Sequence, residues 1–194
     1  EDIEKMAAIT PTEKPYLILT TFDLWKSRIP WLLLLMISAT FTGKIIQNYE
    51  DALASMVILT SFIPMLMDTG GNAGGQASVT IIRGLSLNEI EFKDILKIIW
   101  KEFRVSLFIG ITLAIANYFK LLYIDGVTSS VALVVCLTLI ITVAIAKIVG
   151  CTLPIFAKKL GFDPAVMASP FITTIVDAIS LFVYFSVSCQ LLGI

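Results

Sequence analysis

The sequence predicts an all-α membrane protein with five hydrophobic segments that each cross the bilayer. Of its 194 residues, 57% are hydrophobic and only 15% are charged, and the mean hydropathy is +0.91. A soluble domain is less apolar and has about a quarter of its residues charged. Apolar runs approaching the roughly 20 residues that a helix needs to cross a bilayer recur along the chain, without an internal sequence repeat.

The first segment covers residues 29–46, IPWLLLLMISATFTGKII. Pro30 is expected at the start of its helix, where the missing amide hydrogen costs little, and Trp31 is expected to anchor it at the membrane interface. Residues 1–28 lack the basic start and apolar core of a signal peptide. Because the chain does not begin with Met, we expect it to be a piece of a longer protein.

The second segment is apolar from Ala52 to Met67 and continues as DTGGNAGG. Each glycine weakens a helix by up to about 1 kcal/mol, so the sequence predicts a helix that breaks here and resumes as QASVTIIRG. Irregular backbone at membrane depth is tolerated only where protein buries it or it lines a watery cavity. The alternative is close packing on a neighbouring helix, because Gly70 with Gly74 and Gly71 with Gly75 both have GxxxG spacing.

A polar stripe accompanies the glycines. Asp68, Asn72 and Gln76 follow one another at steps of four residues and therefore share one helix face. This stripe favours a wet surface that faces an ion, where Asp68 and Asn72 can contact the water shell of a cation. A phosphate-binding loop is not indicated, because neither the GxGxxG nor the Walker spacing is present and no Lys follows.

The remaining segments set the predicted orientation. The third covers residues 105–122, after a helical extension that mixes charged and apolar residues; the fourth covers 128–156 and the fifth 164–192. Eleven Lys and Arg residues fall in connections on the side of the N-terminus, and only Lys44 and Lys120 fall on the other side. Since cytosolic connections are rich in Lys and Arg, the N-terminus is predicted inside and the C-terminus outside.

The fifth segment contains an acid, Asp177, fourteen residues after Asp163. At about 1.5 Å per residue it lies roughly 20 Å into the membrane, where an ionised carboxylate is costly and usually functional. Helical spacing places polar residues on the same face, which predicts a polar lining: Ser169, Thr173, Ser180, Tyr184 and Ser188. Two interpretations stay open, a cation site or an ion pair with Lys147, which can otherwise extend toward the cytosol.

The chemistry of this position favours a hard cation. There is no His in the chain, so carboxylate, hydroxyl and carbonyl oxygens are the available ligands, and these suit Mg²⁺ or Ca²⁺. Pro170 withdraws an amide hydrogen, so carbonyls near Ser169 and Thr173 are expected to face the same cavity. Mg²⁺ is commonly held through one or two carboxylates and keeps several waters.

An odd number of crossings excludes two equal inverted halves within one chain. A symmetric pathway therefore needs a second copy, so we expect a homodimer in which two copies of Asp177 face one hydrated ion. No nucleophile and base pair indicates an enzyme. The net charge of −1 gives no basic excess for nucleic acid.

Two stretches carry a family resemblance, PMLMDTGGNAGGQASVTIIRGLSLNEIEFKD and GCTLPIFAKKLGFDPAVMASPFITTIVDAISL. They resemble the membrane domain of MgtE-type bacterial magnesium transporters, and the resemblance covers nearly the whole chain. It implies five helices per protomer and a central Mg²⁺ pore in a homodimer. It also implies that Asp177 is the main ligand and that Gly71, Ser169 and Thr173 surround the ion.

The same resemblance implies the domain organisation and the function. Residues 1–28 look like the end of a CBS region and a plug-like helix, and residues 29–194 like the ion-conducting domain in a bacterial inner membrane. Full-length relatives are expected to carry a cytosolic N-domain and CBS domains that sense Mg²⁺. The expected function is passive inward flux of hydrated Mg²⁺. Two alternatives stay open, a proton- or sodium-coupled transporter of another divalent cation or solute, and a membrane anchor without transport.

Overall fold

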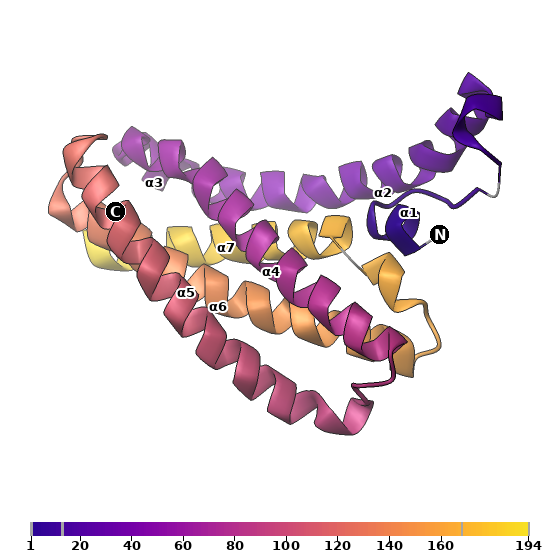
Figure 1. Cartoon of the computed structure of the whole chain (residues 1–194). Helices are drawn as coiled ribbons and strands as arrows, with labels where there is room; N and C mark the ends of the chain where they lie inside the picture. The colour runs from indigo at the N-terminus through magenta and orange to yellow at the C-terminus, as the bar shows by residue number, and fades with distance from the viewer. Residues whose placement is uncertain (1, 13, 168, 194) are drawn as a thin grey trace.

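The computed structural model describes residues 2–12, 14–167 and 169–193, and its regular elements there are all helical, as the sequence predicts (Figure 1). Five long helices form the body: α2 (Thr21–Asn48), α4 (Ile63–Ser86), α5 (Ile95–Tyr123), α6 (Ser129–Lys159) and α7 (Ser169–Leu192). Shorter elements join them: α1 (Asp2–Met6), α3 (Glu50–Ser55) and the 3-10 turns Tyr16–Ile18, Val57–Phe62, Phe92–Asp94 and Pro164–Met167.

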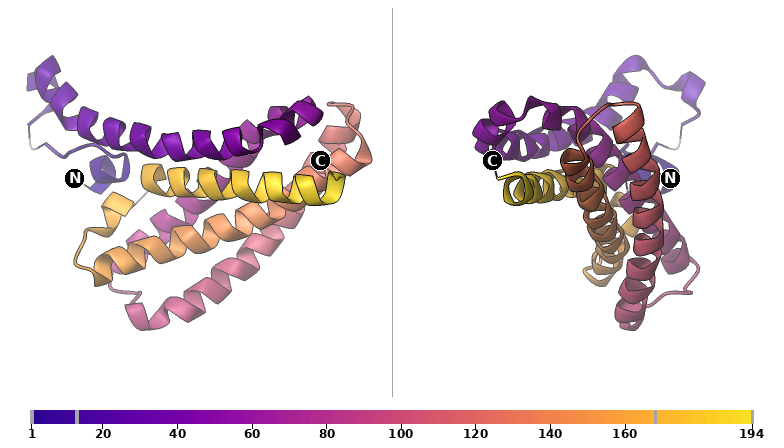
Figure 2. Two further views of the ribbon diagram at one scale, coloured as in Figure 1. Left: turned by 180° about the vertical axis from the view of Figure 1, so that it is seen from behind. Right: turned by 90° about the vertical axis from the view of Figure 1, so that its left-hand side faces the viewer.

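Helix α6 lies at the centre of the bundle, packed against α4, α5 and α7 (Figures 1 and 2). Helix α4 also packs on α7, whereas α2 packs mainly on α7. Gly70 lies beside Val176 and Gly74 beside Ile172, so α4 and α7 run in opposite directions. The N- and C-termini lie at opposite ends of the bundle (Figure 1).

Four helical stretches of the described chain are long and apolar enough to cross a membrane: Thr21–Asn48, Phe92–Tyr123, Ser129–Lys159 and Pro170–Leu192. The fifth predicted crossing corresponds to α4, whose 24 residues extend about 36 Å at 1.5 Å per residue. That length exceeds a hydrocarbon core of about 30 Å. Its glycines and polar stripe make it less apolar than the other four, so its crossing stays a prediction.

The predicted glycine break in the second segment is wrong. Helix α4 runs without interruption from Ile63 to Ser86, through all of its glycines. The irregular backbone lies before it, where α3 ends at Ser55 and a 3-10 turn leads to Pro64, the second residue of α4. An intact helix satisfies its backbone hydrogen bonds internally, which a break at membrane depth does not.

The glycines instead allow close helix packing, as the GxxxG alternative predicts. A Cβ on Gly70 would lie 2.8 Å from Cγ2 of Thr142 on α6, and a Cβ on Gly74 would lie 2.8 Å from Cγ2 of Ile172 on α7. On the α6 side, a Cβ on Gly150 would collide with the carbonyl group of Gly74. Small residues therefore let α4 approach both neighbours at backbone distance.

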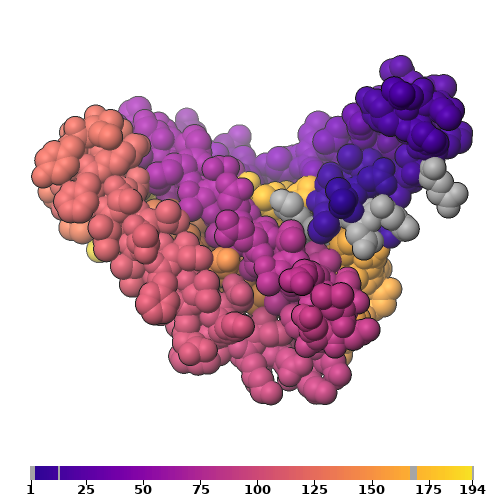
Figure 3. Space-filling model, in the orientation of Figure 1, coloured from indigo at the N-terminus to yellow at the C-terminus, as the bar shows by residue number. Residues whose placement is uncertain are grey.

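Helix α2 begins earlier than the sequence predicted. Its N-cap is Thr20, whose hydroxyl accepts a hydrogen bond from the Asp23 amide at 3.2 Å, while the Thr20 amide donates to the Asp23 carboxylate at 3.1 Å. This capping box fixes the start, so Pro30 lies inside the helix and not at its beginning. No residue of α2 is buried, and its first turns stand away from the bundle (Figures 1 and 3).

The N-terminal segment contacts the connection between α6 and α7. The ammonium of Lys5 in α1 lies 2.7 Å from Oδ2 of Asp163, and the Ala165 amide donates to the same carboxylate at 2.9 Å. The Lys5 ammonium and this amide hold the pKa of Asp163 below its usual range. Helix α1 and the start of the fifth segment therefore lie at the same end of the bundle.

Gly150→Ala should lower the stability of the bundle by about 1–3 kcal/mol, because the new methyl group meets backbone that cannot rotate away. Gly43→Ala on α2 is the matched control, since a Cβ there has nothing within 4 Å. The control should gain up to about 1 kcal/mol from helix propensity. Thermal unfolding in detergent, followed by circular dichroism, measures both variants. Equal stabilisation by the two substitutions would contradict the close α4–α6 contact.

Candidate functional site

Helix α7 places Thr173 and Asp177 one turn apart, both partly exposed. The hydroxyl groups of Thr173 and Thr174 each donate to the Pro170 carbonyl at 3.0 Å. Pro170 is the second residue of α7, where its missing amide hydrogen breaks no helical bond. The expectation that Pro170 frees carbonyls toward a cavity is therefore not supported. Ser169 begins α7, but its side chain lies outside the described part of the structure.

The rest of the predicted polar stripe on α7 faces protein. Ser180 is buried and donates to the Val176 carbonyl at 2.6 Å. Tyr184 is fully buried and its hydroxyl donates to the Leu59 carbonyl at 2.9 Å. Ser188 is also buried. Only the half of the stripe that holds Thr173 and Asp177 can line a polar pathway, because the other half holds α7 to its neighbours.

Helix α4 brings the other predicted residues to the same place. Gly71 is buried against Thr173, where a Cβ would lie 2.9 Å from the threonine Cγ2. Asp68 and Asn72 are exposed, on the same face as Gln76. Gly71 of α4 lies beside Thr173 of α7, and the two helices are antiparallel. Asp68, one turn before Gly71, therefore lies at about the same level as Asp177, one turn after Thr173.

Asp177 has no cation as its partner within the described residues. The ion pairs found there join other side chains, and the Asp177 carboxylate accepts none of the hydrogen bonds. The register of the two helices puts Asp68 and Asp177 on neighbouring turns of α4 and α7, and the Asp177 carboxylate there has no protein cation among the described residues. Such an arrangement is unfavourable unless a cation or water supplies the missing charge or hydrogen bonds.

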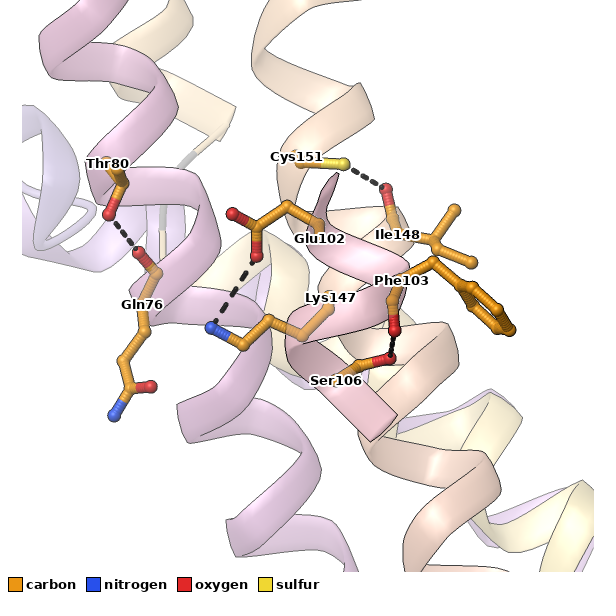
Figure 4. Close-up of polar contacts among 8 residues, drawn as sticks. All are labelled: Gln76, Thr80, Glu102, Phe103, Ser106, Lys147, Ile148 and Cys151. Carbon is orange, nitrogen blue, oxygen red and sulfur yellow. Dashed lines mark hydrogen bonds and ion pairs between the residues drawn. The ribbon is translucent and has the colours of Figure 1, made fainter. Parts of the chain in front are cut away.

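Lys147 does not pair with Asp177, and it does not extend to the cytosol. It is 5% exposed, and its ammonium lies 3.8 Å from Oε2 of Glu102 on α5. Figure 4 shows the two side chains meeting at the junction of α5 and α6, beside α4. The expected extension of Lys147 along the membrane is therefore wrong, because an acid on a neighbouring helix neutralises it in place.

Sequence reasoning missed Glu102 and the role of Tyr184. Glu102 follows Ile95, Ile98 and Ile99 at helical spacing, so it continues the inward face of α5. An acid on an inward apolar face needs a cation nearby, and that signal was present. The bond from Tyr184 to the 3-10 turn had no comparable signal, because it joins residues 125 positions apart.

The described part of one chain does not hold a complete metal site, since no group of three or more His, Cys, Asp and Glu side chains there is placed to bind an ion. Asp177, Asp68 and Thr173 are accessible oxygen-bearing side chains on neighbouring turns of α4 and α7. Such donors suit a cation that keeps most of its water shell, or one shared between two chains.

The family model and the related proteins that match this chain all belong to the same family. A family model described as MgtE, divalent cation transporter, matches residues 63–187. The chain is 34% identical over 192 residues to the magnesium transporter MgtE of Thermus thermophilus, covering 99% of this chain and 42% of that protein. It is 37% identical over 192 residues to the magnesium transporter MgtE of Bacillus subtilis, covering 97% and 41%. The chain thus spans about two-fifths of these relatives, and their names denote transport and not catalysis.

Removing either partner of the Glu102–Lys147 pair should destabilise the protein by about 3–5 kcal/mol, because an uncompensated charge remains buried. Lys147→Met and Glu102→Leu test each side. The double variant should recover most of the loss, since two apolar side chains of similar volume can replace the pair. Chemical denaturation in detergent micelles measures all three. Additive losses in the double variant would show that the two residues do not interact.

Proposed function

We propose that this chain, which belongs to the MgtE family of divalent cation transporters, forms with a second copy a pore for hydrated Mg²⁺. The observation that carries the proposal is Asp177 on α7, which has no cation partner among the described residues and lies one turn from the contact between Thr173 and Gly71 of α4. The nearest buried cation, Lys147, is already paired with Glu102. An acid left without a partner at membrane depth suits a passing cation.

The cation at this position is best described as hydrated. Mg²⁺ loses its waters reluctantly and is often held through one or two carboxylates. At a separation of about 6 Å and an effective dielectric constant of about 40, one carboxylate attracts a divalent ion by about 3 kcal/mol. This is enough for roughly 100-fold tighter binding. Two copies of Asp177, with Asp68 and Asn72 touching the water shell, then hold the ion without stripping it.

A second copy completes the site. One chain supplies Asp177, Asp68 and Thr173 from a single side, and a two-fold axis beside α7 would place the same groups opposite them. Helix α2 has no buried residue in the single chain, which leaves apolar surface for lipid and for the partner. The pathway is then a central pore between protomers and not a channel within one chain.

Transport through this pore needs no coupling ion. A divalent cation moving inward gains about 4.6 kcal/mol per 100 mV, which is twice the value for a single charge. We place the protein in a bacterial inner membrane with its N-terminus in the cytosol, as the distribution of Lys and Arg indicates. In a longer protein, residues 1–28 would connect the pore to a cytosolic Mg²⁺-sensing region that gates it.

Asp177→Asn should reduce the Mg²⁺ influx at low Mg²⁺ concentration by at least about 100-fold, because both copies in the pore lose their charge while the amide keeps the volume of each side chain. Asp125→Asn, in the connection between α5 and α6, is the matched control and should transport like the wild type. Influx is measured in proteoliposomes that contain a Mg²⁺-sensitive dye, under an imposed membrane potential. Wild-type influx through Asp177→Asn would contradict the proposal, and influx that requires a proton or sodium gradient would favour the coupled transporter.

A further inference from the structure

The N-terminal end of α5 presents an exposed face that carries both cations and apolar side chains. Lys97, Lys101 and Arg104 are exposed, and Leu96 and Trp100 beside them are 77% and 59% exposed. Steps of three and four residues place all five on one side of the helix. Helix α5 packs chiefly on α6 and forms the edge of the bundle away from α2 (Figures 1 and 2).

The length of the helix sets the depth of this face in the membrane. The continuous stretch Phe92–Tyr123 has 32 residues, about 48 Å at 1.5 Å per residue. A hydrocarbon core is about 30 Å thick, or about 20 residues of helix. Counted back from Tyr123, an aromatic residue suited to the opposite interface, the core ends near Arg104. Lys97, Lys101 and Trp100 therefore lie at the level of the lipid headgroups.

The exposed charges on this face are positive. The Lys97 ammonium lies 3.7 Å from the Asp94 carboxylate. Exposed ion pairs of this kind contribute little to stability, so Lys97 can exchange Asp94 for another anion. Neither Lys101 nor Arg104 has an acid partner within the described residues, since Glu102 between them turns inward to Lys147. The Arg104 guanidinium lies 5.8 Å from the centre of the Trp100 ring, so a cation and an interfacial aromatic residue occupy the same place.

We propose that this face, formed by Leu96, Lys97, Trp100, Lys101 and Arg104, binds the headgroups of anionic phospholipids. The phosphate accepts hydrogen bonds from Lys101 and Arg104, while the Trp100 ring lies at the interface between the headgroups and the acyl chains. A zwitterionic lipid presents the same phosphate together with its own cation, so it competes poorly. This inference does not depend on the proposed pore, because it concerns the outer edge of the bundle.

Trp100 can report the lipid beside it. The chain has three Trp residues, so a Trp25→Phe/Trp31→Phe background leaves Trp100 as the single fluorophore. The full 194-residue chain is reconstituted in phosphatidylcholine with increasing amounts of brominated phosphatidylglycerol or brominated phosphatidylcholine, whose bromine atoms quench nearby Trp fluorescence. The ratio of the two quenching curves gives the relative affinity of the face for the anionic lipid.

Brominated phosphatidylglycerol should quench Trp100 at a mole fraction several-fold lower than brominated phosphatidylcholine, and high salt should reduce the difference. Lys101→Gln/Arg104→Gln should remove most of this preference, since each cation near the surface strengthens binding about fivefold. Lys26→Gln/Arg28→Gln on α2 removes the same charge elsewhere and should leave the preference unchanged. Equal quenching by the two lipids in the unsubstituted face would overturn the proposal and assign the face to another occupant, such as a cytosolic domain.

Discussion

The close approach of α4 to α6 and α7 is the constraint on which the rest of the structure depends. Gly70, Gly74 and Gly150 remove the side chains that would hold these helices apart. Lipid gives helices no hydrophobic reason to associate, so packing at backbone distance must supply the attraction. The same contact fixes the relative height of α4 and α7, and so brings Asp68 and Gly71 level with Asp177 and Thr173.

The charged residues inside the bundle differ in whether a neighbouring helix supplies a partner of opposite charge. Lys147 is the one buried cation of the described chain, and Glu102 neutralises it. Asp177 has no such partner among the described residues. The ion pair between Lys147 and Glu102 is satisfied within the protein and stabilises the fold. The Asp177 carboxylate has no protein cation beside it, so it needs an ion or water from outside. The described part of the bundle therefore holds a structural ion pair between α5 and α6, and it leaves the Asp177 carboxylate on α7 without a protein cation.

Much of this arrangement could be predicted from the sequence, because helical periodicity and apolar length are local properties. Spacing alone predicts the long helices and the stripe of Asp68, Asn72 and Gln76 on one helix face. It also predicts the position of Asp177 deep in the last helix, but not whether a cation lies beside it. The predictions that were wrong concern features that depend on which helices lie next to each other. Glycines both destabilise a helix and permit close packing, and only the presence of α6 and α7 decides between these effects. The burial of Ser180 and Tyr184, and the pairing of Lys147 with Glu102, likewise depend on which helices are neighbours.

The most direct measurement of the central claim is the position of a divalent cation in the dimer. Crystals of the chain grown in lipid and soaked in Mn²⁺, a divalent ion with an anomalous signal, would locate it. A pore between the protomers predicts an anomalous peak on the two-fold axis, between the two copies of Asp177 and at water-mediated distance from them. A map in which the two carboxylates face lipid or pair with protein cations, with no peak between them, would contradict it.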